Sequence, residues 1–96
     1  MKVTLIIATL NEYGGMKMIM PRIKRDWCDQ IIILDGGSTD GTIEYAQQNG
    51  YFIYIQKKKG LLNGLKEALE FVEGDIVIAF QPDGNCIPEY IPPLIE

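Results

Sequence analysis

The chain has 96 residues, of which 47% are hydrophobic and 23% are charged, and its formal net charge at pH 7 is −4. This composition is typical of one small globular domain, which we assign to residues 1–96, and it excludes a disordered chain or several domains. The acidic balance, with one dense basic cluster at Lys57, Lys58 and Lys59, also argues against a general nucleic-acid-binding surface.

The cysteine and histidine content limits the metal chemistry. The chain has two cysteines, Cys28 and Cys86, and no histidine, so a structural zinc site is excluded. Free thiols in a reducing cytosol are the simplest interpretation, and a disulfide stays open as the alternative. The sequence shows neither a signal peptide nor an apolar run long enough to span a membrane, so we expect a cytoplasmic location.

Short apolar runs rich in β-branched residues predict the strands. The first run, residues 2–9, is almost continuously apolar, as is typical of a strand buried on both faces of a parallel sheet. Further runs of the same kind follow in chain order at residues 30–35, 51–55 and 75–80.

A helix with irregular geometry is predicted after the first strand. Asn11 is its candidate N-cap, and the glycines and the proline of this segment disfavour a regular helix. Its apolar residues recur at spacings of three and four, and they are Met16, Ile19, Met20 and Ile23.

Two clearer helices follow. Residues 42–48 are opened by Asp40 and Gly41 and are stopped by Gly50. Residues 61–72 form the strongest helical pattern of the chain, with Gly74 as terminator. The apolar stripe of that helix is predicted to consist of Leu62, Leu65, Leu69 and Val72. A further helix is predicted to start within residues 90–95.

The alternation of strands and helices predicts an α/β fold. We expect a Rossmann-like, mostly parallel β-sheet with helices on both faces and right-handed crossovers. Ligands of such sheets bind beyond the carboxyl ends of the strands. The candidate functional residues are therefore those that directly follow each strand.

Three polar loops occupy these positions. Residues 8–12 carry an amide and a carboxylate, residues 35–42 carry acids, glycines and hydroxyls, and residues 81–85 carry an acid within a turn. Each loop also has a structural interpretation on its own. Asp35 can accept hydrogen bonds within a turn, Asp40 can cap a helix, Glu12 can be a first-turn acid, and Asp83 can belong to an Asp-Gly turn. Their joint placement at successive strand ends favours a ligand site.

A nucleoside diphosphate suits these residue types. Carboxylates accept hydrogen bonds from ribose hydroxyls or from a base N–H, and glycines let the backbone approach closely. A carboxylate near a diphosphate usually acts through a divalent cation, and Mn²⁺ and Mg²⁺ prefer oxygen ligands. We assign Asp83 to that ion. The lysines at 57–59 beside Gly60 either meet a phosphate group or form a solvated loop.

The chain resembles the N-terminal part of inverting family-two glycosyltransferases with the GT-A fold. The resemblance covers nearly the whole chain, and the stretch LDGGSTDGT is its most specific part. The matching motifs, in order, are Thr9-Leu10-Asn11-Glu12, Leu34 to Thr42 (LDGGSTDGT), Gly64 to Asp75 (GLKEALEFVEGD), and Gln81 to Asn85 (QPDGN) with Pro88-Glu89.

The resemblance implies a role for the matching residues. It places the acid Asp35 against the base and Asp83 at the second acid of the metal-binding DxD motif, which holds the diphosphate through Mn²⁺ or Mg²⁺. It implies a set of nucleotide-binding residues, namely Thr9, Asn11, Glu12, Asp35, Gly37, Lys59, Gly60, Asn63 and Asp83. The first acid of DxD is here Gln81. An amide coordinates a cation without contributing charge, so this departure predicts weaker metal binding.

The function implied by the resemblance is sugar transfer from a UDP- or GDP-linked donor to an acceptor hydroxyl on a saccharide or a lipid-linked acceptor. This chain supplies the donor and metal half, and we expect the general base and the acceptor site beyond Glu96. A non-catalytic nucleotide-binding or oligomeric assembly module is the alternative, favoured if Gln81 has abolished metal binding. A dinucleotide-dependent Rossmann enzyme lacks support, because Thr9–Glu12 stands where the GxGxxG loop belongs. An uncovered sheet edge predicts a homodimer or larger oligomer.

Overall fold

The computed structural model describes residues 2–80. The predicted metal residue Asp83, its neighbour Gln81 and the helix predicted at residues 90–95 lie outside the described residues. Within them, every strand run and every helix predicted between the strands has a counterpart, with differences at several boundaries.

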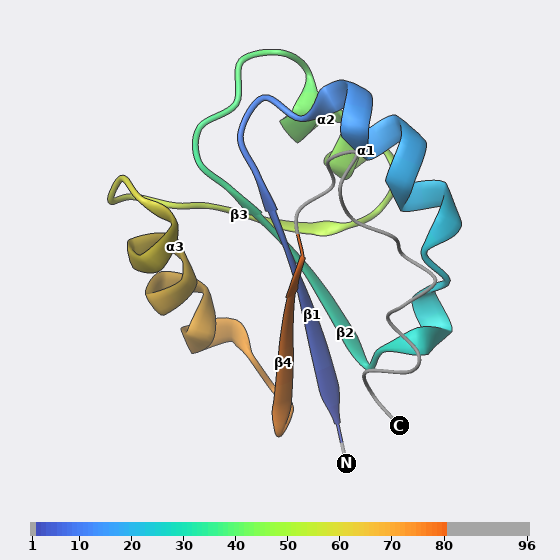
Figure 1. Cartoon of the computed structure of the whole chain (residues 1–96), viewed down its shortest axis with the longest axis vertical. Helices are drawn as coiled ribbons and strands as arrows, with labels where there is room; N and C mark the ends of the chain where they lie inside the picture. The colour runs from blue at the N-terminus through green and yellow to red at the C-terminus, as the bar shows by residue number, and fades with distance from the viewer. Residues whose placement is uncertain (1, 81–96) are drawn as a thin grey trace.

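A parallel sheet forms the centre of the described chain (Figure 1). Its strands lie in the order β3-β2-β1-β4, and all three pairings are parallel. The strands are β1 (Val3–Thr9), β2 (Gln30–Asp35), β3 (Phe52–Ile55) and β4 (Ile76–Phe80). The chain moves outward from β1 to β3 and then returns to place β4 on the other side of β1. This reversal of strand order marks the point where α/β sheets bind ligands.

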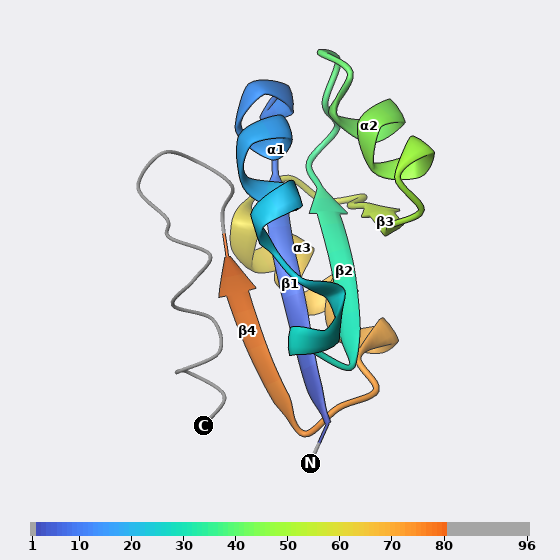
Figure 2. The same ribbon diagram turned by 90° about the vertical axis from the view of Figure 1, so that its right-hand side faces the viewer.

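Helices cover both faces of the sheet, as predicted. Figures 1 and 2 show α1 and α2 on one side of the sheet and α3 on the other. The helices are α1 (Tyr13–Ile19), α2 (Thr42–Gln48) and α3 (Leu61–Ala68). Short 3₁₀ turns at Met20–Arg22 and Leu69–Phe71 extend α1 and α3, and a third lies at Arg25–Trp27 before β2.

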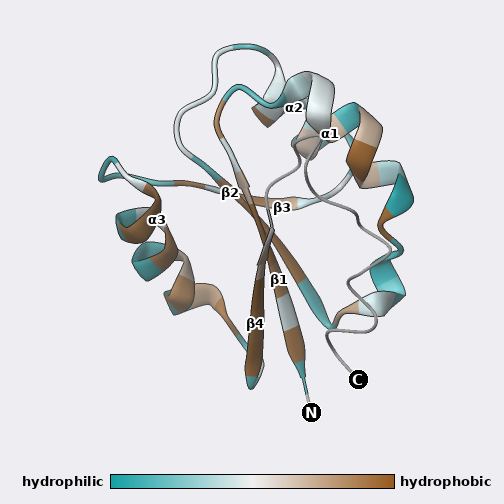
Figure 3. Cartoon of the chain, in the orientation of Figure 1, coloured by the Kyte–Doolittle hydropathy of each residue, from teal (hydrophilic) through white to brown (hydrophobic). Residues whose placement is uncertain are grey.

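Side-chain alternation along β1 and β2 divides the core into two clusters. Successive residues of a strand point to opposite faces, so Leu5 and Ile7 face one layer of helices while Ile6 faces the other. The cluster under α1 and α2 contains Leu5, Ile7, Met16, Ile19, Met20, Ile23, Ile33 and Ala46. The cluster under α3 contains Ile6, Ile32, Leu34 and Ala68. Figure 3 shows the hydrophobic strands between the two helical layers.

Burial differs between the central and outer strands. β1 is buried along almost its whole length, as predicted. The same prediction was wrong for β3, where Phe52 and Ile55 are exposed, and for β4, where Val77 is exposed. β3 and β4 are the outer strands of the described sheet, so each has a neighbouring strand on one side only.

The apolar stripe predicted for the third helix was wrong in part. The buried positions of α3 are the small residues Gly64 and Ala68, which let the helix approach the sheet closely. Leu65 and Val72 are partly buried against the same cluster. The side chains of Leu62 and Leu69 are 67% and 53% exposed, so they lie on the flank of the helix. A regular spacing of leucines therefore did not identify the contact face.

None of the helices within residues 2–80 has the length and apolar character that crossing a bilayer requires.

Two glycine substitutions test the packing of this fold. A Cβ atom at Gly74 would lie 2.6 Å from the backbone oxygen of Lys2, so that the backbone must shift. We expect Gly74→Ala to lower the free energy of unfolding by about 1–3 kcal/mol. The matched control is Gly14→Ala within α1, where a Cβ meets nothing within 4 Å. Its higher helix propensity should raise the free energy of unfolding by up to about 1 kcal/mol. Urea unfolding measures both, and equal effects would contradict the packing described.

Candidate functional site

The buried carboxylate of Asp35 organises the carboxyl edge of the sheet. Asp35 ends β2 and is 0% exposed. Its Oδ1 accepts hydrogen bonds from the hydroxyls of Thr9 (2.7 Å) and Ser38 (2.6 Å). Its Oδ2 accepts hydrogen bonds from the backbone N–H groups of Gly37 and Ser38, both at 2.7 Å. Four donors therefore bond to the two carboxyl oxygens of Asp35, so this loop is fixed to the ends of β1 and β2.

The loop after β2 also holds the start of α1. The backbone N–H of Asn11 donates to Ser38 Oγ (2.8 Å), and Asn11 Oδ1 accepts from the N–H of Thr39 (2.8 Å). Asn11 has a positive φ of 53°, and α1 begins only at Tyr13. The prediction that Asn11 caps this helix was therefore wrong, because its side chain bonds to another loop instead of to the first helical turn.

The hydrogen-bond acceptors for the N–H groups at the start of α1 come from Asp40 and Thr42 and not from Asn11. The N–H of Tyr13 donates to Asp40 Oδ2, and the N–H of Glu12 donates to Thr42 Oγ1, each at 3.1 Å. Asp40 also accepts from the N–H of Thr42 at 3.1 Å, so it bonds to the starts of both α1 and α2. The hydrogen bond from the Thr42 hydroxyl is the largest cause that lowers the pKa of Asp40, and backbone N–H groups add to it. The N-cap residue of α2 is Gly41, which makes no side-chain capping hydrogen bond, so the interpretation of Asp40 as the helix cap was wrong. Asp40 lies one residue before that cap and bonds to the N–H of Thr42, the first residue of the helix.

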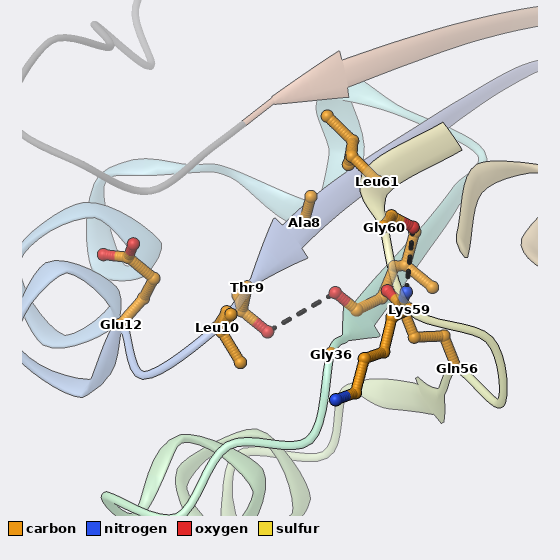
Figure 4. A pocket seen from close by; sticks show the side chains of 10 residues that line it. Ala8, Thr9, Leu10, Glu12, Gly36, Gln56, Lys59, Gly60 and Leu61 are labelled. Atoms are coloured by element: carbon orange, nitrogen blue, oxygen red, sulfur yellow. Dashed lines mark hydrogen bonds between the residues drawn. The ribbon is translucent and has the colours of Figure 1, made fainter. Parts of the chain in front are cut away.

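A cavity of about 570 Å³ opens beside this network. It lies at the carboxyl ends of β1, β2 and β3 and at the start of α3, and its volume is typical of small-molecule sites. Figure 4 shows Glu12 at one end of the cavity and Gln56, Lys59 and Gly60 at the other. The lining residues are Ala8, Thr9, Leu10, Glu12, Leu34, Gly36, Gln56, Lys59, Gly60 and Leu61.

The structure brings some of the predicted nucleotide-binding residues into this cavity. Thr9, Glu12, Lys59 and Gly60 are in its lining. The remaining predicted residues within the described chain are not in the lining, and they are Asn11, Asp35, Gly37 and Asn63. Their hydrogen bonds run to neighbouring backbone and side chains, as with Asn63 Nδ2, which donates to the carbonyl of Lys59 (2.8 Å).

Sequence reasoning did not single out Leu10, Gln56 and Leu61 as lining residues. Leu10 and Leu61 are 58% and 50% exposed, and both face the cavity. Gln56 directly follows β3, and its Nε2 donates to the carbonyls of Lys58 (2.7 Å) and Gly60 (3.0 Å). The signal that identifies Gln56 is its position directly after a strand, which it shares with the polar residues that follow the other three strands.

The described residues alone do not form a metal centre. Among residues 2–80, no three or more carboxylate, cysteine or histidine side chains are grouped so that they could hold an ion. Within the part of the chain that the structure describes, Glu12 is the one carboxylate that lines the cavity. A cation at this edge therefore needs ligands from beyond Phe80 or from a bound phosphate.

The strand order and the position of the cavity define a class of protein. A parallel β3-β2-β1-β4 sheet with its cavity at the carboxyl edge has the architecture of Rossmann-like α/β domains, which bind ligands at that edge. The family model described as glycosyl transferase family 2 matches residues 4–96. The chain belongs to this family.

Curated relatives are similar over most of this chain. A dolichol-phosphate mannosyltransferase from Pyrococcus furiosus is 32% identical over 104 residues, which cover 100% of this chain and 30% of the relative. The glycosyltransferase AglJ from Haloferax volcanii is 28% identical over 84 residues, which cover 86% of this chain and 28% of the relative. The chain thus spans about a third of the length of these relatives.

Solved structures show the same fold. Glucosyl-3-phosphoglycerate synthase from Mycobacterium tuberculosis, in complex with Mn²⁺, UDP-glucose and phosphoglyceric acid, matches with a TM-score of 0.76 and 27% identity. The match covers 95% of this chain and 36% of that chain. Another solved structure, that of a mycobacterial protein, matches with a TM-score of 0.79 and 26% identity, over 98% of this chain and 35% of that chain. The sheet described above is therefore the Rossmann-like part of a GT-A fold.

A substitution at Asp35 tests the network at the carboxyl edge. Asp35→Asn replaces one acceptor oxygen with an NH₂ group that faces hydrogen-bond donors, so at least one buried donor loses its partner. We expect the free energy of unfolding to fall by about 2–3 kcal/mol. The control Asp26→Asn changes an exposed acid in the turn before β2 and should stay within about 0.5 kcal/mol of the unchanged protein. Denaturant unfolding measures both, and an unchanged midpoint for Asp35→Asn would contradict the assignment.

Proposed function

We propose that this chain binds the nucleotide part of a nucleotide-diphosphate sugar and supplies the donor side of a glycosyltransferase. The observation that carries the proposal is the cavity at the carboxyl ends of β1, β2 and β3, with a lysine and a carboxylate in its lining. The comparisons support it, because the relatives are named as sugar transferases and the synthase of similar fold was solved with UDP-glucose and Mn²⁺.

The lining residues suit the parts of such a donor. Leu10 and Leu61 offer apolar surface for a planar base, and Gly36 between them has no side chain to block it. The amide of Gln56 donates both of its protons to backbone carbonyls, so its Oε1 is left as an acceptor for a base N–H.

The charged lining residues suit the polar parts of the donor. Glu12 accepts hydrogen bonds from ribose hydroxyls, and the ammonium group of Lys59 pairs with a phosphate. The buried Asp35 acts from behind by holding this edge in shape. The base contact expected of Asp35 stays a prediction, and it requires that one of the four present hydrogen bonds be exchanged.

A divalent cation, Mn²⁺ or Mg²⁺, completes the donor side in this proposal. Asp83 and the Gln81 carbonyl offer oxygen ligands of the kind that these ions prefer, and they follow β4 directly in sequence. When bound, the ion stabilises negative charge on the departing diphosphate. The acceptor, whether a saccharide or a lipid-linked molecule, belongs to the whole protein. The cytoplasmic location and the homo-oligomer also stay predictions.

Nucleotide binding tests the proposal directly. Calorimetric titration of the purified chain with UDP and with GDP, each with Mn²⁺, should show saturable binding of one nucleotide. Lys59→Ala should weaken that binding about tenfold, because it removes one charge-assisted contact to a phosphate. The matched control Lys57→Ala removes the same charge from the same loop but outside the cavity lining, and should change the affinity less than threefold, or about 0.6 kcal/mol. Equal losses for the two variants would indicate a general charge effect, and no binding by the folded chain would refute the proposal.

Metal removal separates the two forms of the proposal. If Asp83 holds the cation, adding EDTA and substituting Asp83→Asn should each weaken nucleotide binding, and EDTA should have no further effect on the variant. If nucleotide binding is the same with Mn²⁺ and with EDTA, the metal assignment is wrong. That result would favour the alternative of a non-catalytic nucleotide-binding module, as the replacement of an acid by Gln81 suggests.

A further inference from the structure

The loop between β3 and α3, residues 57–60, has its backbone held by side chains on both sides. The amide of Gln56 donates to the carbonyls of Lys58 (2.7 Å) and Gly60 (3.0 Å). Asn63 Nδ2 donates to the carbonyl of Lys59 (2.8 Å). These two amides bond to the carbonyl groups of residues 58–60, and a third side chain bonds to the N–H groups of Lys57 and Lys58.

That third side chain is Glu67, which lies nearly two turns into α3. Its Oε1 accepts from the N–H of Lys57 (2.8 Å), and its Oε2 accepts from the N–H of Lys58 (3.0 Å). The phenol of Tyr54 on β3 donates to Oε1 as well (2.7 Å). A single carboxylate therefore joins a strand, a loop and a helix.

The ionisation of Glu67 agrees with this arrangement. The backbone N–H groups of Lys57 and Lys58 are the largest causes that lower the pKa of Glu67, followed by the Tyr54 hydroxyl. The same hydrogen bond to Glu67 is the largest cause that raises the pKa of Tyr54. Glu67 is thus a charged acceptor, and Tyr54 a protonated donor, at neutral pH.

The two residues that Glu67 fixes come directly before the two that line the cavity. Lys59 and Gly60 are in the lining, whereas Lys57 and Lys58 are not. Because Glu67 bonds to the backbone of residues 57 and 58, it sets the point from which Lys59 extends. A ligand that meets a lysine on a fixed backbone loses less conformational entropy on binding than one that must order the loop.

We propose that Glu67 is a positioning residue that holds the loop so that Lys59 meets the phosphate groups of the bound nucleotide. The proposal rests on the proposed function, and it adds a residue outside the cavity to the binding machinery. Glu67 acts through the backbone of its neighbours and does not touch the ligand.

The sign of the effect distinguishes this role from simple electrostatics. Glu67 carries a negative charge on the helix that follows a loop meeting an anionic ligand, so removing that charge would by itself raise the affinity for UDP. A positioning role predicts the opposite, because Glu67→Gln replaces one acceptor oxygen with an NH₂ group and releases a backbone N–H of the loop. We expect Glu67→Gln to weaken UDP binding about fivefold to tenfold, within the range of one lost hydrogen bond.

A double-mutant cycle with Lys59 provides the decisive measurement. UDP affinity with Mn²⁺ is measured by calorimetry for the unchanged chain, Glu67→Gln, Lys59→Ala and the double variant. If Glu67 acts through Lys59, Glu67→Gln should change the affinity less than twofold once Lys59 is alanine, since the two losses are not additive. The matched control Glu70→Gln removes an exposed carboxylate of the next 3₁₀ turn and should not lower the affinity.

Three outcomes would contradict the proposal. Equal losses in both backgrounds would show that Glu67 acts on the fold in general and would overturn the positioning role. A gain in affinity for Glu67→Gln would show that charge alone matters and would overturn it too. If the unchanged chain binds neither UDP nor GDP, the proposed function fails first and the role of Glu67 falls with it.

A second variant covers the case in which Glu67→Gln does not fold. Tyr54→Phe keeps the carboxylate and removes only the phenol that orients it. We expect a loss of UDP affinity of about twofold to threefold that vanishes in the Lys59→Ala background. The same loss in both backgrounds would contradict the proposal.

Discussion

A buried carboxylate with all of its acceptor positions occupied controls the ligand edge of this domain. The polar side chain of Asp35 would be costly to bury without partners, and its four hydrogen bonds offset that cost only while the loop after β2 keeps its present shape. The residue therefore couples the ends of β1 and β2 to the backbone of Gly37 and Ser38. The shape of the cavity beside Asp35 therefore depends on these four hydrogen bonds.

The loops after β1 and β2 also constrain each other, because each loop provides hydrogen-bond partners for polar groups of the other. The loop after β2 provides acceptors for the first N–H groups of α1, and Asn11 in the loop after β1 accepts a hydrogen bond from Thr39 in return. Side chains also hold the loop after β3. Gln56 donates to the carbonyl of Lys58, and Glu67 accepts from the N–H groups of Lys57 and Lys58. The edge of the sheet is thus stabilised by side chains that reach between loops, with hydrogen bonds in place of apolar burial.

Local signals in the sequence predicted the elements but not these exchanges. The helix Thr42–Gln48 has the predicted boundaries because its start and stop residues act on their own neighbours. The cap assigned to Asn11 was wrong because the partners of Asn11 are 27 and 28 residues away in sequence. The leucine stripe of α3 misled for a related reason: the close approach of helix to sheet at Gly64 and Ala68 depends on tertiary packing, which periodicity does not contain. Four predicted nucleotide-binding residues line the cavity, whereas Asp35 is buried and is not in the lining, since an acid at a strand tip suits either position.

The positions of the cavity-lining residues along the chain determine when each part of the site is synthesised. The lining residues within the described chain lie between Ala8 and Leu61, on β1 and β2, in the loops that follow β1, β2 and β3, and at the start of α3, and none of them lies on β4. A ribosome therefore releases these lining residues, and the helix that carries Glu67, before it releases Asp83, the residue assigned to the cation. In the proposed function, the described lining residues and the cation residue Asp83 are encoded in separate, consecutive stretches, which are free to change at different rates during evolution.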